Sequence, residues 1–105
     1  MDRTDTERLV GNFLAALNAR DMAALAALLD EDVVHDAPDG RRSVGADALR
    51  EWLFRQATRS DETIADMVVM SDASGTHAAA EFTRRGRHGE GGQADAMRDV
   101  LLFEV

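Results

Sequence analysis

The sequence of 105 residues has no cysteine, no tyrosine and no lysine, and its only proline is Pro38. Without cysteine the chain has no disulfide bond, no thiol nucleophile and no thiolate ligand for a metal ion. The three histidines, His35, His77 and His88, are far apart in the sequence, which is weak evidence for a metal site. We therefore predict neither a metal nor any other cofactor.

Positive charge is also scarce, because 12 arginines face 20 acidic residues and give a formal net charge of −8. Nucleic-acid binding requires a positive surface, so this balance argues against a nucleic-acid partner. One basic stretch, "RRGRH" at residues 84–88, lacks aromatic neighbours for base stacking and indicates an exposed hairpin end. No apolar run approaches the roughly 18 residues of a membrane span, and the N-terminus has no signal-peptide core. We expect a cytoplasmic protein that makes no membrane contact.

The first half of the chain carries apolar residues at helical spacing. This spacing predicts a helix over about residues 5–18, with Thr4 and Glu7 in the pattern of a capping box. Asp21 can cap a second, shorter helix. A third helix is predicted over about residues 46–57.

Strand signals complete the pattern. A short apolar run at residues 33–35 predicts one strand, and "PDG" after it is a turn signature. From residue 62 onward the apolar period becomes two, which predicts the strands "ETIADMVVM", "THAAAEFTRR" and "ADAMRDVLLFEV", joined by the turns "SDASG" and "GRHGEGGQ". The chain therefore predicts one α+β domain over residues 1–105, with helices on one face of a curved antiparallel sheet.

Asp36 is the first candidate for a functional carboxylate. It follows the short strand and shares its parity with Val34, while His35 lies on the opposite face. If Val34 faces inward, Asp36 looks into the same space and is a candidate general base. The alternative is a loop carboxylate that only begins the "APDG" turn.

Asp99 is the second candidate, because it shares its strand parity with Met97, Leu101, Phe103 and Val105. A lone carboxylate on such an apolar face must find a partner or be protonated. The alternative is a twist or bulge that lets Asp99 reach solvent, or an ion pair with a neighbouring arginine.

Aromatic and aliphatic residues from several elements could form the wall of an apolar pocket, although a plain core is the commoner use of such residues. The predicted pocket residues are Phe13, Leu17, Val34, Trp52, Phe82, Met97, Leu101 and Phe103.

The motifs "ALNARD", "ALLDEDVV" and "GADALREWL" follow one another within residues 13–53, with the "APDG" loop between the last two. This part of the chain resembles the ketosteroid isomerase and SnoaL-like branch of the nuclear transport factor two-like superfamily, whose fold is also called the cystatin-like cone. The later strands match that branch in order and length. The resemblance implies a cone, in which a bent sheet wraps three helices around a deep and mostly apolar cavity.

The resemblance also implies roles for both aspartates. Asp36, nine residues before Gly45, falls on the general base that moves a proton between carbons of the substrate. Asp99 falls on a protonated carboxylic acid that donates a hydrogen bond to the enolate oxygen. A tyrosine that shares this second task aligns with Phe13, which has no hydroxyl, so we expect altered or weak catalysis.

Chains of this family usually continue past a segment like "LLFEV" into another long strand, and this sequence lacks it. The omission would expose an apolar strand edge. Either the sequence is part of a longer chain, or a partner subunit in a homodimer covers the gap.

Three functions follow from these patterns. The first is an isomerase or cyclase that abstracts a proton from an apolar carbonyl compound. The second is a non-catalytic module that binds a small apolar ligand in the same cavity, and the third is a dimeric assembly domain whose cavity is incidental. The sequence identifies no substrate, because apolar pockets discriminate by shape.

Overall fold

The computed structural model describes residues 2–59, 62–87 and 94–105. The helices are α1 (Arg3–Ala19), α2 (Met22–Leu28) and α3 (Ala46–Arg59). The strands are β1 (Val34–Asp36), β2 (Arg42–Val44), β3 (Thr63–Ser71), β4 (His77–Arg87) and β5 (Ala94–Glu104). The predicted α+β architecture with three helices is confirmed. Most of the predicted turn "GRHGEGGQ" lies outside the described residues.

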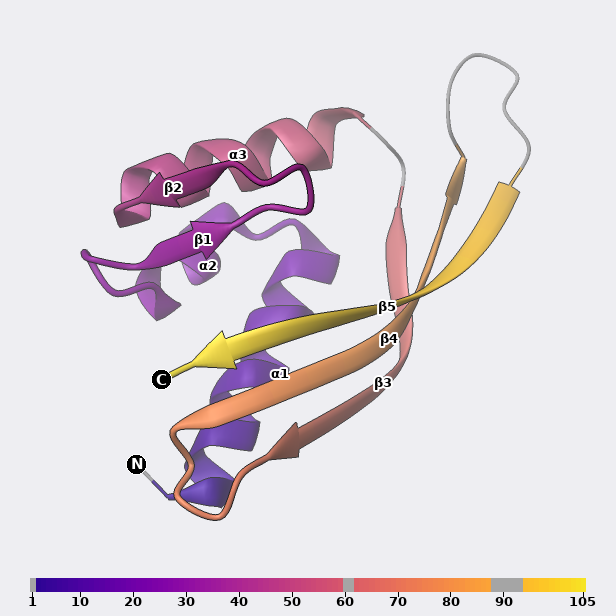
Figure 1. The fold of residues 1–105 in the computed structure, drawn as a ribbon. Coiled ribbons are helices and arrows are strands. Elements are labelled where there is room, and N and C mark those ends of the chain that lie inside the picture. Colours follow the sequence, from indigo (N-terminus) through magenta and orange to yellow (C-terminus); the bar gives the residue numbers. More distant parts are fainter. Residues whose placement is uncertain (1, 60–61, 88–93) are drawn as a thin grey trace.

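The strands form two separate antiparallel sheets, one with the order β3-β4-β5 and one with the order β1-β2 (Figure 1). The sequence pattern predicted β1 and missed β2, whose residues "RSV" have no apolar alternation. The charges of the sequence do indicate β2. Asp36 faces Arg42 across the two strands, and opposite charges at facing positions stabilise the pairing of two strands.

The start of α1 differs from the prediction. Asp2 is the N-cap, and its side chain accepts a hydrogen bond from the backbone N–H of Asp5 at 2.8 Å. The predicted capping box of Thr4 and Glu7 is therefore not formed. Asp21 caps α2 as expected, with its carboxylate accepting from the backbone N–H of Ala24 at 3.0 Å.

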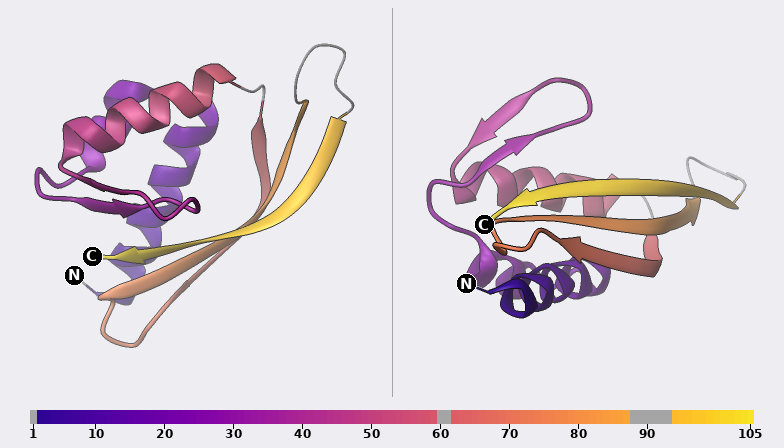
Figure 2. Two further views of the ribbon diagram at one scale, coloured as in Figure 1. Left: turned by 45° about the horizontal axis from the view of Figure 1, so that its top comes forward. Right: turned by 60° about the horizontal axis from the view of Figure 1, so that its bottom comes forward.

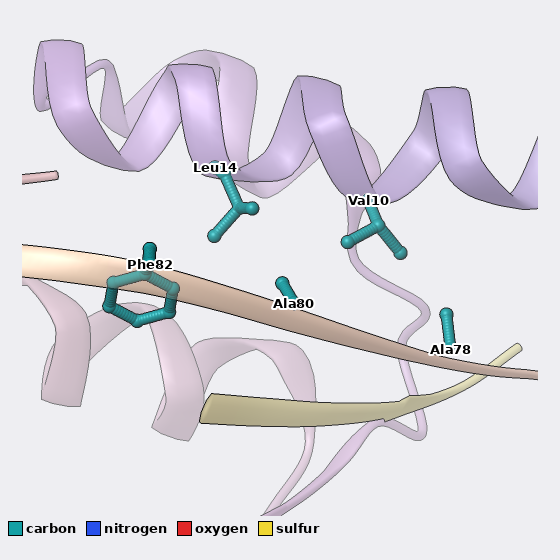
Figure 3. Packing of buried hydrophobic residues seen from close by; sticks show 5 residues of the cluster. All are labelled: Val10, Leu14, Ala78, Ala80 and Phe82. Atoms are coloured by element: carbon teal, nitrogen blue, oxygen red, sulfur yellow. The ribbon is translucent and has the colours of Figure 1, made fainter. Parts of the chain in front are cut away.

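The core lies between α1 and the concave face of the larger sheet. Val10 and Leu14 of α1 point toward Ala78, Ala80 and Phe82 of β4 (Figure 3). Burial of these side chains removes apolar surface from water, which is the main force that holds the helix on the sheet. A second buried cluster, between the three helices, contains Ala16, Leu25, Leu49 and Leu53.

The first edge of the larger sheet is tied to the end of α1. The side chain of Asn18 accepts a hydrogen bond from Ile64 N–H at 2.9 Å and donates one to the Ile64 carbonyl at 3.2 Å. Arg20 donates to the Glu62 carbonyl at 3.2 Å. These side chains act as a substitute for a neighbouring strand, because they satisfy backbone groups on the open edge of β3.

The larger sheet bends strongly along its strands, and the helices lie on its concave side with the β1-β2 hairpin next to α3 (Figure 2). β5 is an edge strand of the larger sheet, and among the described strands it pairs only with β4. Across the three described ranges, no helix combines the length and the hydrophobicity needed to cross a lipid bilayer.

Candidate functional site

The concave face of the larger sheet carries one cluster of charged side chains, formed by Glu62, Arg84 and Asp99. Arg84 Nη2 lies 3.5 Å from Asp99 Oδ2, and Arg84 Nε lies 3.0 Å from Glu62 Oε2. Arg84 and Asp99 come from β4 and β5 and are diagonal neighbours across the ladder. One guanidinium thus contacts two carboxylates.

The surroundings of Asp99 agree with the predicted parity of its strand. Asp99 faces the buried Phe82 in the register of β4 and β5, and Leu101 and Phe103 on the same face are partly buried. The side chain of Asp99 retains 37% exposure. The expected partner is found in an arginine of the neighbouring strand. Asp99 thus lies next to a guanidinium donor, whereas the resemblance implied a carboxylic acid that itself donates a hydrogen bond.

Asp36 does not face the interior. Its carboxylate makes two contacts with Arg42 on β2, with Nε at 2.7 Å from Oδ1 and Nη2 at 3.1 Å from Oδ2. The side chain is 63% exposed, and its neighbour in parity, Val34, is 51% exposed. The hydrogen bonds from Arg42 lower the pKa of Asp36 below its usual value, with the positive charge of Arg42 as a further cause. The predicted inward orientation of Val34 and Asp36 is therefore wrong. Asp36 and Asp99 each form an ion pair with a different arginine.

His35 occupies the inward position that was expected for Val34. Its ring is partly buried and lies against Trp52 of α3, with a distance of 4.5 Å between ring centroids. Trp52 in turn packs against the cluster of Leu25, Leu49 and Leu53. The parity of β1 is therefore the reverse of the predicted one.

The predicted pocket residues fall into two groups. Phe82 is buried, and the partly buried members pack against the two core clusters; these are Phe13, Leu17, Trp52, Leu101 and Phe103. Phe13 contacts both clusters and meets Phe103 edge to face, with 5.7 Å between ring centroids. Val34 and Met97 are instead exposed, Met97 to 54%. Six of the eight residues therefore belong to, or pack against, the two buried clusters, and Phe13 contacts both.

One open groove of about 410 Å³ lies along α2 and α3. Its lining combines two apolar side chains with three charged ones and contains none of the predicted site residues; it consists of Met22, Asp47, Arg50, Glu51 and Phe54. Arg50 and Asp47 form an ion pair along one rim. A groove this open keeps its charged groups in water, which suits it poorly for proton transfer.

Sequence reasoning allowed an arginine partner for Asp99 without naming Arg84, and it missed Glu62 as the second carboxylate beside Arg84. Arg84 has the strand parity of Phe82, so it was detectable as a charged residue on an otherwise apolar face. Glu62 opens the predicted strand "ETIADMVVM" but lies one residue before β3. Within residues 2–59, 62–87 and 94–105, histidine and acidic side chains form no group of three that could hold a metal ion. What the charged cluster can do is accept and return protons.

Several known proteins are similar to this chain in sequence and fold. The SnoaL-like domain matches residues 10–105. A proposed polyketide cyclase from Pseudomonas putida has a solved structure with a TM-score of 0.87 and 37% identity, and the match covers 95% of this chain and 81% of that chain. A second one, from Xanthomonas campestris, has a TM-score of 0.91 and 31% identity, with coverage of 100% and 84%. The chain matches no curated protein.

A proposed ketosteroid isomerase from Kribbella flavida shares the fold at 22% identity, with a TM-score of 0.74 and coverage of 98% of this chain and 70% of that chain. The family resemblance predicted from the motifs of residues 13–53 is thereby confirmed. The chain belongs to the SnoaL-like domain family, within the branch of the nuclear transport factor two-like fold that includes cyclases and isomerases.

Proposed function

We propose that the protein is a small-molecule isomerase or cyclase that abstracts a proton from an apolar carbonyl compound, with Asp99 as the general base. The observation that carries this proposal is the pairing of Asp99 with Arg84 on the apolar concave face. The names of the solved relatives, which are proposed polyketide cyclases, support the same class of reaction.

The contacts of Arg84 support the choice of base. Arg84 contacts both Asp99 and Glu62, and its distance to Asp99, 3.5 Å, is the longer of the two, so Asp99 is the less tightly held carboxylate. The apolar side chains of Phe82, Leu101 and Phe103 would contact the hydrocarbon part of a substrate. Asp36, by contrast, is exposed and its pKa is lowered, which makes it a weaker base.

The reaction has two steps. The carboxylate of Asp99 takes a proton from the carbon next to the carbonyl, and the electron pair of that C–H bond moves into an enolate. An isomerase then returns the proton from Asp99 to another carbon of the enolate. A cyclase instead lets the enolate carbon attack a second carbonyl, and Asp99 gives its proton to the new alkoxide. Both routes regenerate the charged base.

Exchange of carbon-bound hydrogen for deuterium tests the first step without knowledge of the natural substrate. Apolar ketones such as 2-tetralone are incubated in D₂O with the full chain, and loss of the α-proton signal is followed by NMR. We expect Asp99→Asn to slow the enzyme-dependent exchange by about 10²–10⁴-fold, since this is the usual contribution of a general base.

Asp36→Asn is the matched control, because it removes a carboxylate from the same protein outside the concave face. We expect it to change the exchange rate by less than about threefold, since it leaves the general base intact. If Asp36→Asn abolished exchange and Asp99→Asn did not, the assignment of the base would be reversed and the proposal rejected.

A non-catalytic binding module is the second candidate. It is favoured by Phe13, which has no hydroxyl, and by the outward position of Asp36, because two groups of the isomerase mechanism are then missing. In that case the wild-type protein binds 2-tetralone, and no ketone of the series undergoes exchange above the buffer rate. Isothermal titration calorimetry alongside the exchange assay separates the two functions.

A further inference from the structure

The register of β3 with β4 shifts by one residue between Ala65 and Val68. Asp66 and Met67 of β3 therefore lie opposite the single residue Phe82 of β4, which is the pattern of a β-bulge. Asp66 has a φ of 53°, in the left-handed region that is strained for residues other than glycine. The bulge thus depends on a backbone conformation that its surroundings must support.

The bulge determines which side chains at the start of β3 face the helices. Side chains alternate between the two faces of a strand, and Val69, after the bulge, packs against the core on the concave face. Without the extra residue, Ile64 and Glu62 would lie on the convex face, because each is an odd number of positions from Val69. With it, Ile64 packs against the same core and Glu62 contacts Arg84. The bulge therefore brings the second carboxylate to Arg84.

Arg98 of β5 holds the bulge from the convex face of the sheet. Its Nη1 donates to the Asp66 carbonyl at 3.0 Å and to Thr83 Oγ1 at 2.9 Å, and its Nε donates to Glu81 Oε1 at 2.8 Å. This guanidinium thus joins β5 to both β4 and β3. Arg85 adds a longer contact, 3.6 Å from its Nη2 to the Asp66 carboxylate. The hydrogen bond from Arg98 to the strained residue offsets part of the cost of its conformation.

We propose that Arg98 positions the charged cluster through the bulge at Asp66. By holding the bulge, it keeps Glu62 beside Arg84. Its part in catalysis rests on the proposed function, in which Asp99 is the base. When the bulge loosens and Glu62 moves away, Asp99 becomes the remaining carboxylate of the cluster for Arg84 and is held more tightly. A carboxylate held more tightly is a weaker base, so Arg98 on one face of the sheet controls proton transfer on the other.

The structural part is tested by NMR on the full chain without any ligand. A strong cross-peak between the amide and α protons of Asp66 marks its left-handed backbone, because these protons lie close together at positive φ. Cross-peaks between the side chains of Glu62 and Arg84 mark their contact. We expect both signals to weaken in Arg98→Ala, which removes the hydrogen bond to the Asp66 carbonyl. Unchanged signals in this variant would overturn the inference.

A second substitution tests whether Arg98 acts through the bulge. Glycine adopts a positive φ without strain, so Asp66→Gly should support the bulge without help from Arg98. In the double variant of Arg98→Ala and Asp66→Gly, we expect the cross-peaks between Glu62 and Arg84 to return. Glycine restores neither the lost positive charge nor the contact with Glu81, so recovery isolates the effect of the bulge. Absence of recovery would overturn the inference.

Exchange of the α-protons of 2-tetralone in D₂O tests the role in catalysis. We expect Arg98→Ala and Glu62→Gln each to slow the exchange by about 10-fold, since each leaves Arg84 with one carboxylate of the cluster. The double variant of these two should be no slower than Glu62→Gln, because both changes act through one contact. Additive slowing would contradict the proposed route. Arg41→Ala, which removes an exposed arginine of the loop between β1 and β2, should change neither the rate nor the cross-peaks.

The outcomes separate this inference from the proposed function. If Asp99→Asn abolishes exchange while Arg98→Ala exchanges at the wild-type rate, the proposed function stands and the positioning role of Arg98 is rejected. If the wild-type protein does not exchange the protons of 2-tetralone, both are rejected.

Discussion

At the scale of single residues, the pair of Asp36 and Arg42 predicts a pH effect with a definite sign. Because Arg42 lowers the pKa of Asp36 in the folded state, the pair stabilises the fold above the ordinary pKa of aspartate, about 3.9. That contribution is lost as the pH falls through the lowered pKa. Arg42→Ala should therefore raise the pKa of Asp36 and lower stability at neutral pH, but not in strong acid.

The measurement is an NMR titration of the Asp36 carboxyl carbon, combined with urea unfolding at several pH values. Arg41→Ala is the control, because Arg41 pairs with Asp39 on the same loop at 3.6 Å. It should leave the titration of Asp36 unchanged. An equal effect of both substitutions would mean that general loss of positive charge, and not the contact, sets the pKa.

The two aspartates show how far side-chain direction could be read from the sequence. Asp99 lies in a strand of 11 residues, and its period of two identifies the apolar face. Asp36 ends a strand of 3 residues that begins at Val34 and follows Val33, so the two parities are almost equally apolar. The contact of His35 with Trp52 decides between them, and no local pattern encodes a contact 17 positions away along the chain.

At the scale of elements, the side chain of Asn18 fastens α1 to β3, and its removal should be measurable. Asn18→Ala deletes two hydrogen bonds to the backbone of Ile64, so we expect the free energy of unfolding to fall by about 1–2 kcal/mol. The urea midpoint should fall with an unchanged m-value. Asn12→Ala on the exposed face of α1 is the control, and should stabilise slightly through helix propensity. Equal midpoints for both variants would contradict the fastening role.

Elements with long apolar patterns were predictable, and elements defined by pairing were not. The three helices and the three long strands follow from spacing alone. β2 exists because Arg42, Ser43 and Val44 lie opposite β1, and Asp2 replaces the expected cap because it lies one residue before the helix begins at Arg3. Competing strand pairings and helix caps have similar free energies, so the local sequence does not select one of them.

At the scale of the whole molecule, the convex face of the larger sheet is exposed and apolar. Two cross-strand rows form it, one with Val68 and Val100 beside Glu81, and one with Met70 and Leu102 beside Ala79. Leu102 is 82% exposed. An apolar patch of this kind on a folded chain marks an interaction surface. It adjoins the edge of β5 that has no partner among the described strands.

We propose that a second copy of the chain covers this face in a twofold homodimer, since a twofold axis brings the same rows of both copies together. Leu102→Glu should convert the dimer to a monomer in light scattering coupled to gel filtration. Phe54→Glu, at a side chain 56% exposed on α3, is the matched control and should leave the mass unchanged. Because each copy carries a net charge of −8, added salt should screen the repulsion and strengthen the wild-type dimer. A wild-type monomer at high salt, or a dimer that persists in Leu102→Glu, would contradict this interface.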